Sequence, residues 1–245
     1  RHFGIGGDGI ILVCPSKVAD AKMKMYNLDG SEGKMCGNGI RCVGKFLYDH
    51  GMVDINEKDE ITIETLSGIK KLKAYTSGGK VNRLRVDMGK AILDPKEIPV
   101  VLDGDKVVDR PVEIAGKNYN ITCVSMGNPH CVVFMDDIDN LDIETVGPEF
   151  ENDKLFPERV NTEFVTVLDD HTIKMRVWER GSGETWACGT GACAVAVAAC
   201  ENGFCKKGED IKIKLKGGDL IINYTDETVY MTGNAEKVFE GEVEV

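Results

Sequence analysis

Apolar residues recur at helical spacing in two stretches of the chain, and each stretch follows a cysteine. Side chains three and four residues apart predict one helix after Cys36 and another after Cys188. Gly51 and Gly203 lie at the same distance from their cysteines, where a glycine can end a helix in the left-handed conformation. The spacing therefore predicts two helices of similar length, each with a cysteine at its entry.

Strict alternation of apolar and polar residues follows each predicted helix and indicates two β-hairpins. Residues 61–66 and 69–74 form the first hairpin, around Ser67 and Gly68, and residues 211–215 and 220–224 form the second, around Gly217 and Gly218. Similar segments then close both halves: Val86–Ala91 reads VDMGKA, and Tyr230–Ala235 reads YMTGNA. The order of elements is thus the same in both halves of the chain.

The repeated order predicts an α+β fold of two structurally similar domains, each a mostly antiparallel sheet around a central helix. We expect the N-terminal repeat domain to comprise residues 1–84 plus 236–245, and the C-terminal repeat domain residues 85–235. Pseudo-twofold packing would bring the two cysteines to opposite sides of one cleft. The active site is therefore expected in the cleft between the domains.

The second half contains a segment that the first half lacks. Residues 126–134, which include an apolar run, lie upstream of Arg159, whereas the first half begins at Arg1, in the position that corresponds to Arg159. With the repeat as a ruler, we expect roughly 30 to 40 residues, a strand and its connection, to be missing from the first domain. The alternative is that the first half never had this strand, which would leave an unpaired sheet edge.

Charge and cysteine content exclude several classes of protein. The net charge of −11 disfavours a nucleic-acid partner, and the longest apolar run, Ala194–Cys200, is too short to cross a bilayer. Nine cysteines without CxxC spacing, with only four scattered histidines, predict neither a disulfide framework nor a metal site. Free thiols of this kind are typical of a reducing cytoplasm, where we expect the protein.

Each predicted helix begins in a Cys-Gly-x-Gly sequence, which carries the chemistry. The glycines allow close approach of a ligand, and the free N–H groups of the first turn can bind a carboxylate. The helix dipole would stabilise a thiolate, so the pKa values of Cys36 and Cys188 are expected to be lowered. Two thiols facing one α-carbon suit proton removal from one face and delivery to the other, without a cofactor.

Several motifs together resemble the diaminopimelate epimerase family of PLP-independent amino-acid racemases. They are Asn27-Leu28-Asp29-Gly30-Ser31, Met35-Cys36-Gly37-Asn38-Gly39, Gly127-Asn128-Pro129-His130, Arg159-Val160-Asn161, Glu179-Arg180-Gly181 and Cys188-Gly189-Thr190-Gly191. The resemblance covers essentially the whole chain. It implies interconversion of LL- and meso-2,6-diaminopimelate by an isomerase of lysine biosynthesis, with this small molecule as the partner and a homodimer as the assembly.

The resemblance also assigns roles to residues. Cys36 and Cys188 are the two acid/base thiols, and His130 and Glu179 tune them. Gly37, Asn38, Gly189 and Thr190 hold the carboxylate at the reacting centre, while Asn27, Asn128, Asn161, Glu179 and Arg180 bind the distal amino-acid end. Gly9 and Trp186 depart from the family pattern, because some members carry Gln near position 9 and a smaller aliphatic residue is expected at 186.

Two alternatives remain at this point. A proline racemase or hydroxyproline epimerase would use the same thiol pair, but those enzymes typically show Met-Cys-Gly-His at the first motif, where this chain has Asn38. A non-catalytic redox or binding protein, in which the two thiols form a switch, is the more distant alternative.

Overall fold

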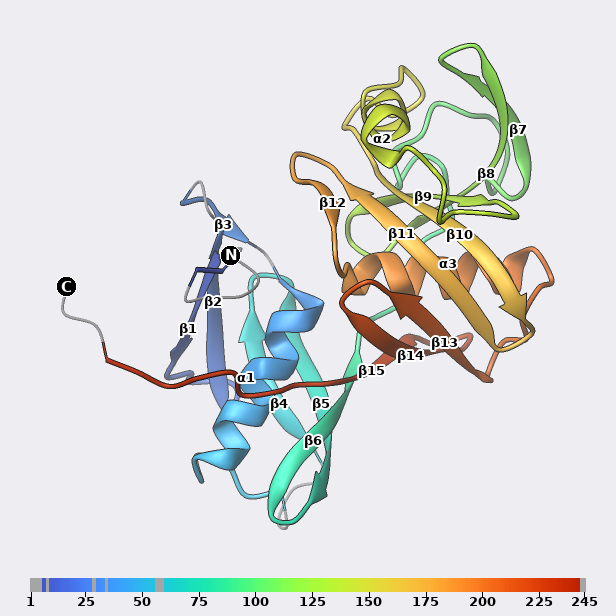
Figure 1. Cartoon of the computed structure of the whole chain (residues 1–245). Coiled ribbons are helices and arrows are strands. Elements are labelled where there is room, and N and C mark those ends of the chain that lie inside the picture. The colour runs from blue at the N-terminus through green and yellow to red at the C-terminus, as the bar shows by residue number, and fades with distance from the viewer. Residues whose placement is uncertain (1–5, 8, 28–29, 34, 56–59, 243–245) are drawn as a thin grey trace. The chain divides into compact units, whose positions relative to one another are not determined.

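The computed structural model describes residues 6–7, 9–27, 30–33, 35–55 and 60–242. The chain divides into two compact units. The first contains Arg1–Asp87 and Thr232–Val245, and the second contains Met88–Met231 (Figure 1).

The first unit is a sheet with one helix. Its elements are β1 (Gly9–Cys14), β2 (Ala21–Asn27), β3 (Glu32–Gly33), α1 (Gly37–Asp49), β4 (Ile61–Thr65), β5 (Gly68–Ser77) and β6 (Lys80–Asp87). The strands follow the order β1-β2-β4-β5-β6, and β3 pairs with β2. The β2–β4 pair is parallel, whereas β1–β2, β2–β3, β4–β5 and β5–β6 are antiparallel. Helix α1 contacts β4, β5 and β6.

The second unit is larger. Its elements are β7 (Arg110–Ile114), β8 (Lys117–Ser125), β9 (Pro129–Phe134), α2 (Ile143–Glu151), β10 (Asn161–Asp169), β11 (Thr172–Glu179), β12 (Gly183–Thr185), α3 (Gly189–Glu201), β13 (Asp210–Leu215), β14 (Gly218–Tyr224) and β15 (Val229–Asn234), whose last three residues belong to the first unit. The strand order is β15-β14-β13-β11-β10-β9-β8-β7, with β12 on β11. The β9–β10 and β11–β13 pairs are parallel.

The structure confirms the α+β class and the two cysteine-led helices. Gly51 and Gly203 have φ of 66° and 78°, in the left-handed region expected after a helix. Both hairpins are also confirmed: β4 pairs with β5 and β13 with β14, each antiparallel. The sequence analysis did not predict helix α2 or several strands, which are β1, β2, β3, β7, β8, β10, β11 and β12.

The strand orders of the two units differ in length. In the second unit, β9, β8 and β7 follow β10 in the strand order, whereas β1 is the last strand of the first unit within the part of the chain described. Ile10 and Leu12 on β1 are 59% and 42% exposed, although both are apolar. The expectation that a strand is missing from the first domain stays a prediction.

The two helices are covered to different extents. Helix α3 is composed almost entirely of Gly, Ala, Val and Cys, and its residues Ala192–Ala199 are fully buried. It contacts β8, β9, β10, β13 and β14, as expected for a helix that is apolar all round. Helix α1 has one buried face and keeps Phe46 40% exposed. None of the described helices is long and apolar enough to span a membrane.

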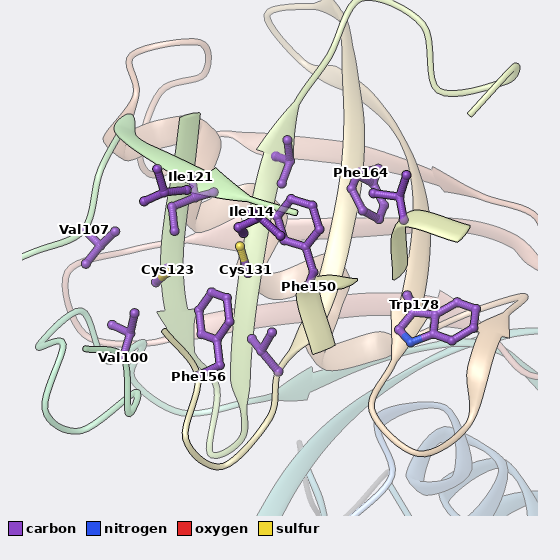
Figure 2. Close-up of a cluster of buried hydrophobic side chains, with 14 of the residues drawn as sticks. Val100, Val107, Ile114, Ile121, Cys123, Cys131, Phe150, Phe156, Phe164 and Trp178 are labelled. Atoms are coloured by element: carbon purple, nitrogen blue, oxygen red, sulfur yellow. The ribbon is translucent and has the colours of Figure 1, made fainter. Parts of the chain in front are cut away.

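A cluster of buried side chains joins α2 to strands β7–β11 in the second unit (Figure 2). Phe150 of α2 lies edge-on to Phe164 of β10, with 5.4 Å between ring centroids, and Tyr119 lies edge-on to Phe150 at 4.9 Å. Such aromatic pairs stabilise a core beyond the area that they bury. Trp178 of β11 belongs to this cluster, so the packing fixes the strand that carries Glu179.

We expect the protein to lose stability in alkali. Burial raises the pKa of Cys200 to about 12 and that of Cys205 to about 11, from an ordinary value of 9.0. The unfolded chain therefore releases protons near pH 9 that the folded chain retains, and the free energy of unfolding falls as pH rises above about 9. Urea denaturation between pH 8 and pH 11 would measure this fall. A Cys200→Ala/Cys205→Ala variant should show a shallower slope, and an equal slope would contradict the prediction.

Candidate active site

Cys188 is the N-cap of α3 and Cys36 is the N-cap of α1. Both cysteines have extended backbones, with φ/ψ of −115°/111° and −129°/117°. The Gly191 N–H donates to Cys188 Sγ at 3.4 Å, and the Gly39 N–H donates to Cys36 Sγ at 3.3 Å. Each sulfur thus takes the place that a Ser or Asp oxygen usually holds at a helix start. The same cap geometry occurs once in each unit.

In the second unit, the predicted polar residues lie at one edge of the sheet, where the ends of three neighbouring strands meet. Strands β9 and β10 are parallel and begin at this edge, whereas β11 is antiparallel to β10 and ends there. The register pairs His130 with Asn161 and Thr162 with Trp178. Glu179, the last residue of β11, follows Trp178 and therefore reaches the same edge.

A chain of hydrogen bonds connects this edge to the start of α3. Glu163 Oε1 lies 2.7 Å from His130 Nδ1, and His130 Nε2 lies 3.1 Å from Asn128 Oδ1. The Asn128 amide donates to Thr190 Oγ1 at 3.3 Å, and Thr190 Oγ1 lies 3.5 Å from Cys188 Sγ. Two of the predicted residues, His130 and Asn128, are thereby joined to the predicted thiol through Thr190.

The electrostatics of Cys188 differ from the sequence-based expectation. Burial raises the pKa of the Cys188 thiol well above its usual value, and the carboxylates of Glu179 and Glu163 raise it further. Hydrogen bonds from Thr190 and Gly191 oppose this effect. The predicted lowering of the Cys188 pKa is therefore wrong, because desolvation and two nearby carboxylates outweigh the helix N-terminus.

Glu179 also has a raised pKa. Burial is the main cause, and the neighbouring Glu163 adds to it, while hydrogen bonds with Thr185 and Cys188 and the nearby His130 offset part of the rise. The Thr185 hydroxyl on β12 donates to Glu179 Oε1. Glu179 and Cys188 therefore act on each other in opposite directions: the Glu179 carboxylate raises the pKa of the Cys188 thiol, whereas the hydrogen bond with Cys188 lowers the pKa of Glu179.

Asn161 has both ends of its amide bound to backbone groups. Its Nδ2 donates to the Pro129 carbonyl at 3.0 Å, and its Oδ1 accepts the Arg180 N–H at 3.0 Å. The Arg180 guanidinium donates to the Glu158 carbonyl at 3.0 Å. Asn161 thus ties the start of β9 to the turn after β11. Its predicted substrate contact, like that of Arg180, stays a prediction.

Glu151, at the end of α2, supports the same turn and was not predicted. Its Oε1 accepts from the Gly181 N–H at 2.8 Å and from Arg159 at 3.0 Å, and its Oε2 accepts from Trp178 Nε1 at 2.7 Å. Glu151 is 6% exposed, so this carboxylate is buried and fully used. It holds the Trp178 side chain on one side of Glu179 and Arg180 and the Gly181 backbone on the other.

The predicted residues of the first unit lie at the end of β2 and the start of α1. Asn27 ends β2, and its Nδ2 donates to Ser31 Oγ at 3.0 Å. Leu28 and Asp29, which belong to the same motif, lie outside the described residues. Gly37 and Asn38 form the first turn of α1, as Gly189 and Thr190 do in α3. Their predicted role in carboxylate binding remains a prediction.

Glu163 is the second buried carboxylate that the sequence analysis missed. It is fully buried on β10, within a segment that reads NTEFV. A charged residue inside an otherwise buried strand is rare unless it is paired, which was the available signal.

The structure also places the two departures from the family pattern. At Gly9, a Cβ would lie only 2.3 Å from the Tyr26 carbonyl oxygen, so a side chain there would require the backbone to shift. The Trp186 side chain is 43% exposed.

Comparison with known sequences gives a consistent family match. The family model for diaminopimelate epimerase matches residues 1–93 and 122–238. The diaminopimelate epimerase of Acetivibrio thermocellus is 54% identical over 247 residues, which cover 100% of this chain and 86% of that protein. The diaminopimelate epimerase of Agathobacter rectalis is 52% identical over 254 residues, covering 100% of this chain and 87% of that protein.

Solved structures with low sequence identity share the fold. A probable proline racemase from Agrobacterium radiobacter K84 has a TM-score of 0.70 at 16% identity, covering 92% of this chain and 73% of that one. A PhzF-family phenazine biosynthesis protein from Bacillus anthracis has a TM-score of 0.69 at 19% identity, covering 97% and 85%. These similarities concern the fold alone.

The two cap glycines offer a matched test of the packing at α3. A Cβ on Gly191 would lie 2.5 Å from Glu163 Oε1, and a Cβ on Gly39 would lie 2.3 Å from Ile11 Cδ1. Glu163 is fully buried and cannot move away easily, whereas the partly exposed Ile11 can swing aside. Gly191→Ala should therefore cost about 1–3 kcal/mol of unfolding free energy, and Gly39→Ala clearly less. Urea denaturation of both variants checks this, and equal losses would contradict it.

Proposed function

The chain belongs to the diaminopimelate epimerase family, and on that premise we propose that it interconverts LL- and meso-2,6-diaminopimelate by a two-base mechanism with Cys36 and Cys188. One sulfur, as a thiolate, takes the α-proton from one face of the substrate. The other, as a thiol, gives a proton to the opposite face. The stereocentre is inverted, and the two sulfurs have exchanged protonation states at the end of the turnover: the former thiolate is a thiol and the former thiol is a thiolate.

The observation that carries this proposal is the duplicated cysteine cap. In each unit a sulfur accepts a backbone N–H from the first turn of a helix, and glycines stand one and three residues after the cysteine. The remaining N–H groups of the first turn are suited to a carboxylate, whose charge grows as the α-proton leaves. Gly37, Asn38, Gly189 and Thr190 would supply this support to the substrate.

The polar groups around Cys188 fit the roles proposed for them. His130 and Glu179 would influence the protonation of the thiols, and Glu179 is close enough to Cys188 to raise the pKa of its thiol. Asn27, Asn128, Asn161, Glu179 and Arg180 would bind the distal amino-acid end of diaminopimelate, where a guanidinium can pair with a carboxylate in bidentate fashion. A substrate without a distal amino-acid group would leave them unpaired, which favours selectivity.

The chemistry proposed here requires neither pyridoxal phosphate nor a metal ion. Its place is the cytoplasmic synthesis of lysine, and a homodimer is the proposed assembly. The proline racemase alternative rests on fold similarity at 16% identity, whereas the family match rests on sequence over most of the chain.

Replacing either thiol should stop epimerisation, because each serves one face of the α-carbon. We expect Cys36→Ala and Cys188→Ala each to lower kcat by about 100-fold or more, in line with the loss of a general acid or base. The measurement is NMR of LL-diaminopimelate in deuterated water, which follows both formation of the meso isomer and entry of deuterium at the α-carbon.

Two other cysteines provide matched controls. Cys42→Ala removes an exposed thiol from α1, and Cys193→Ala removes a buried thiol from α3, five residues after Cys188. Both variants should epimerise at close to the unmodified rate. The two-thiol mechanism is wrong if Cys36→Ala and Cys188→Ala both retain near-normal turnover. A chelator that abolishes activity, with recovery on adding a metal, would instead refute the metal-free chemistry.

A further inference from the structure

We infer that Glu163 is a positioning residue for the Cys188 half of the site, acting through His130, Asn128 and Thr190 to direct a hydrogen bond at the Cys188 sulfur. Its effect on catalysis rests on the function proposed above. No role was assigned to Glu163 by the sequence motifs, and among the described residues the hydrogen bonds at Cys188 Sγ come from Thr190 and Gly191 rather than from Glu163.

The contact between Glu163 and His130 has the features of a fixed pair. Both side chains are completely buried, and Oε1 lies 2.7 Å from Nδ1. Burial of a carboxylate is costly unless strong hydrogen bonds compensate, so the position is not explained by packing alone. Glu163 Oε2 has no hydrogen-bond partner among the described residues, which leaves His130 as the main compensation. A leucine could fill a similar volume without this cost.

The hydrogen bonds run in one direction, toward the thiol. Asn128 uses its Nδ2 as the donor to Thr190, so its Oδ1 is left to accept from His130 Nε2–H. The Glu163 carboxylate accepts from Nδ1–H, so this direction requires a proton on both ring nitrogens. Thr190 Oγ1 accepts from Asn128, and its own O–H can then point to Cys188 Sγ. Once Cys188 has lost its proton, the hydroxyl is the only possible donor between these two atoms.

Glu163 determines whether this direction is kept. A histidine ring that is held at Nδ1 by a buried carboxylate has a fixed orientation, and its other nitrogen is aimed at Asn128. Without the carboxylate the ring need not keep a proton on both nitrogens and can flip, and Asn128 can rotate its amide. Thr190 would then lose its donor, and its hydroxyl would no longer be directed at the sulfur.

The carboxylate also carries an electrostatic cost. Glu163 contributes to the raised pKa of Cys188, and Thr190 and Gly191 lower it. A residue with a purely structural role would be better uncharged at this place. The geometry therefore points to a trade-off, in which an unfavourable charge near the thiol is accepted for the orientation that it imposes on His130.

The test uses a reaction that needs one thiol at a time. With the two α-epimers of β-fluorodiaminopimelate, a thiolate takes the α-proton, the C–F bond breaks, and fluoride leaves with the bonding electrons. The net loss of HF gives an enamine and requires only one base. Fluoride release by Cys36→Ala and Cys188→Ala identifies which epimer depends on which sulfur, and this step tests the proposed function by itself.

The rates of fluoride release by two Glu163 variants are then compared at saturating analogue, so that a change in binding affinity does not affect the comparison. Glu163→Leu removes the acceptor, and Glu163→Gln keeps the shape but allows either histidine tautomer. For the Cys188-dependent epimer, we expect Glu163→Leu to lower kcat about 10- to 100-fold, the range known for removing the partner that orients a metal-binding histidine, and Glu163→Gln to lower it less. Release from the Cys36-dependent epimer should stay within about twofold.

Thr162→Val is the matched control. Thr162 precedes Glu163 on β10, is fully buried, and its hydroxyl has no hydrogen-bond partner among the described residues. This variant should change neither epimer's rate, and thermal unfolding of each variant verifies that the protein is folded. Glu163→Gln serves as the readable variant if Glu163→Leu fails to fold.

The outcomes separate two failures. If both epimers slow equally in the Glu163 variants, or neither slows, the positioning role is overturned while the thiol pair stands. If Cys188→Ala releases fluoride from both epimers at the normal rate, the proposed function itself fails, whatever the Glu163 variants do. A loss confined to the Cys188-dependent epimer in Glu163→Leu, or in Glu163→Gln where the leucine variant is unfolded, supports the inference.

Discussion

The second unit depends on one constraint: helix α3 has no polar face. A helix composed of Gly, Ala, Val and Cys cannot leave any side in water without losing apolar burial, so strands from both flanks must cover it. The small side chains allow β8, β9, β10, β13 and β14 to approach. Strands β9 and β10 begin, and β11 ends, near the first turn of α3. The same packing that encloses the helix therefore places His130, Glu163 and Glu179 near Cys188.

Burial makes the Cys188 thiol harder to ionise, and the polar residues around it modify this effect. A sulfur removed from water resists ionisation, and two carboxylates in its vicinity make this worse. The hydrogen bonds from Gly191 and Thr190 act in the opposite direction. The environment of Cys188 is therefore a balance between opposing effects rather than a uniformly activating one, and small changes in orientation can shift it.

The local pattern of the sequence was sufficient for the repeated elements but not for the environment of the thiol. Helices after Cys36 and Cys188, their glycine stops and both hairpins follow from spacing within about fifteen residues, which is the range over which periodicity acts. Glu163 and Glu151 meet their partners across the sheet, at separations of 33 and 30 residues from His130 and Gly181. No local pattern encodes such contacts. The expectation that a helix N-terminus lowers a thiol pKa failed for Cys188 because it ignored burial.

The unequal covering of the two helices has a consequence for local opening. Helix α3 can expose its amides to solvent only if strands on several sides separate, which approaches global unfolding, whereas α1 can detach from one face of its sheet. Amide hydrogen exchange of Ala192–Ala199 should therefore follow the unfolding free energy of the whole second unit, and that of α1 should be governed by smaller fluctuations. The two thiols thus have the same cap geometry but lie on helices of different rigidity. Local opening of α1 would expose Cys36 to solvent, whereas Cys188 stays covered unless the second unit unfolds.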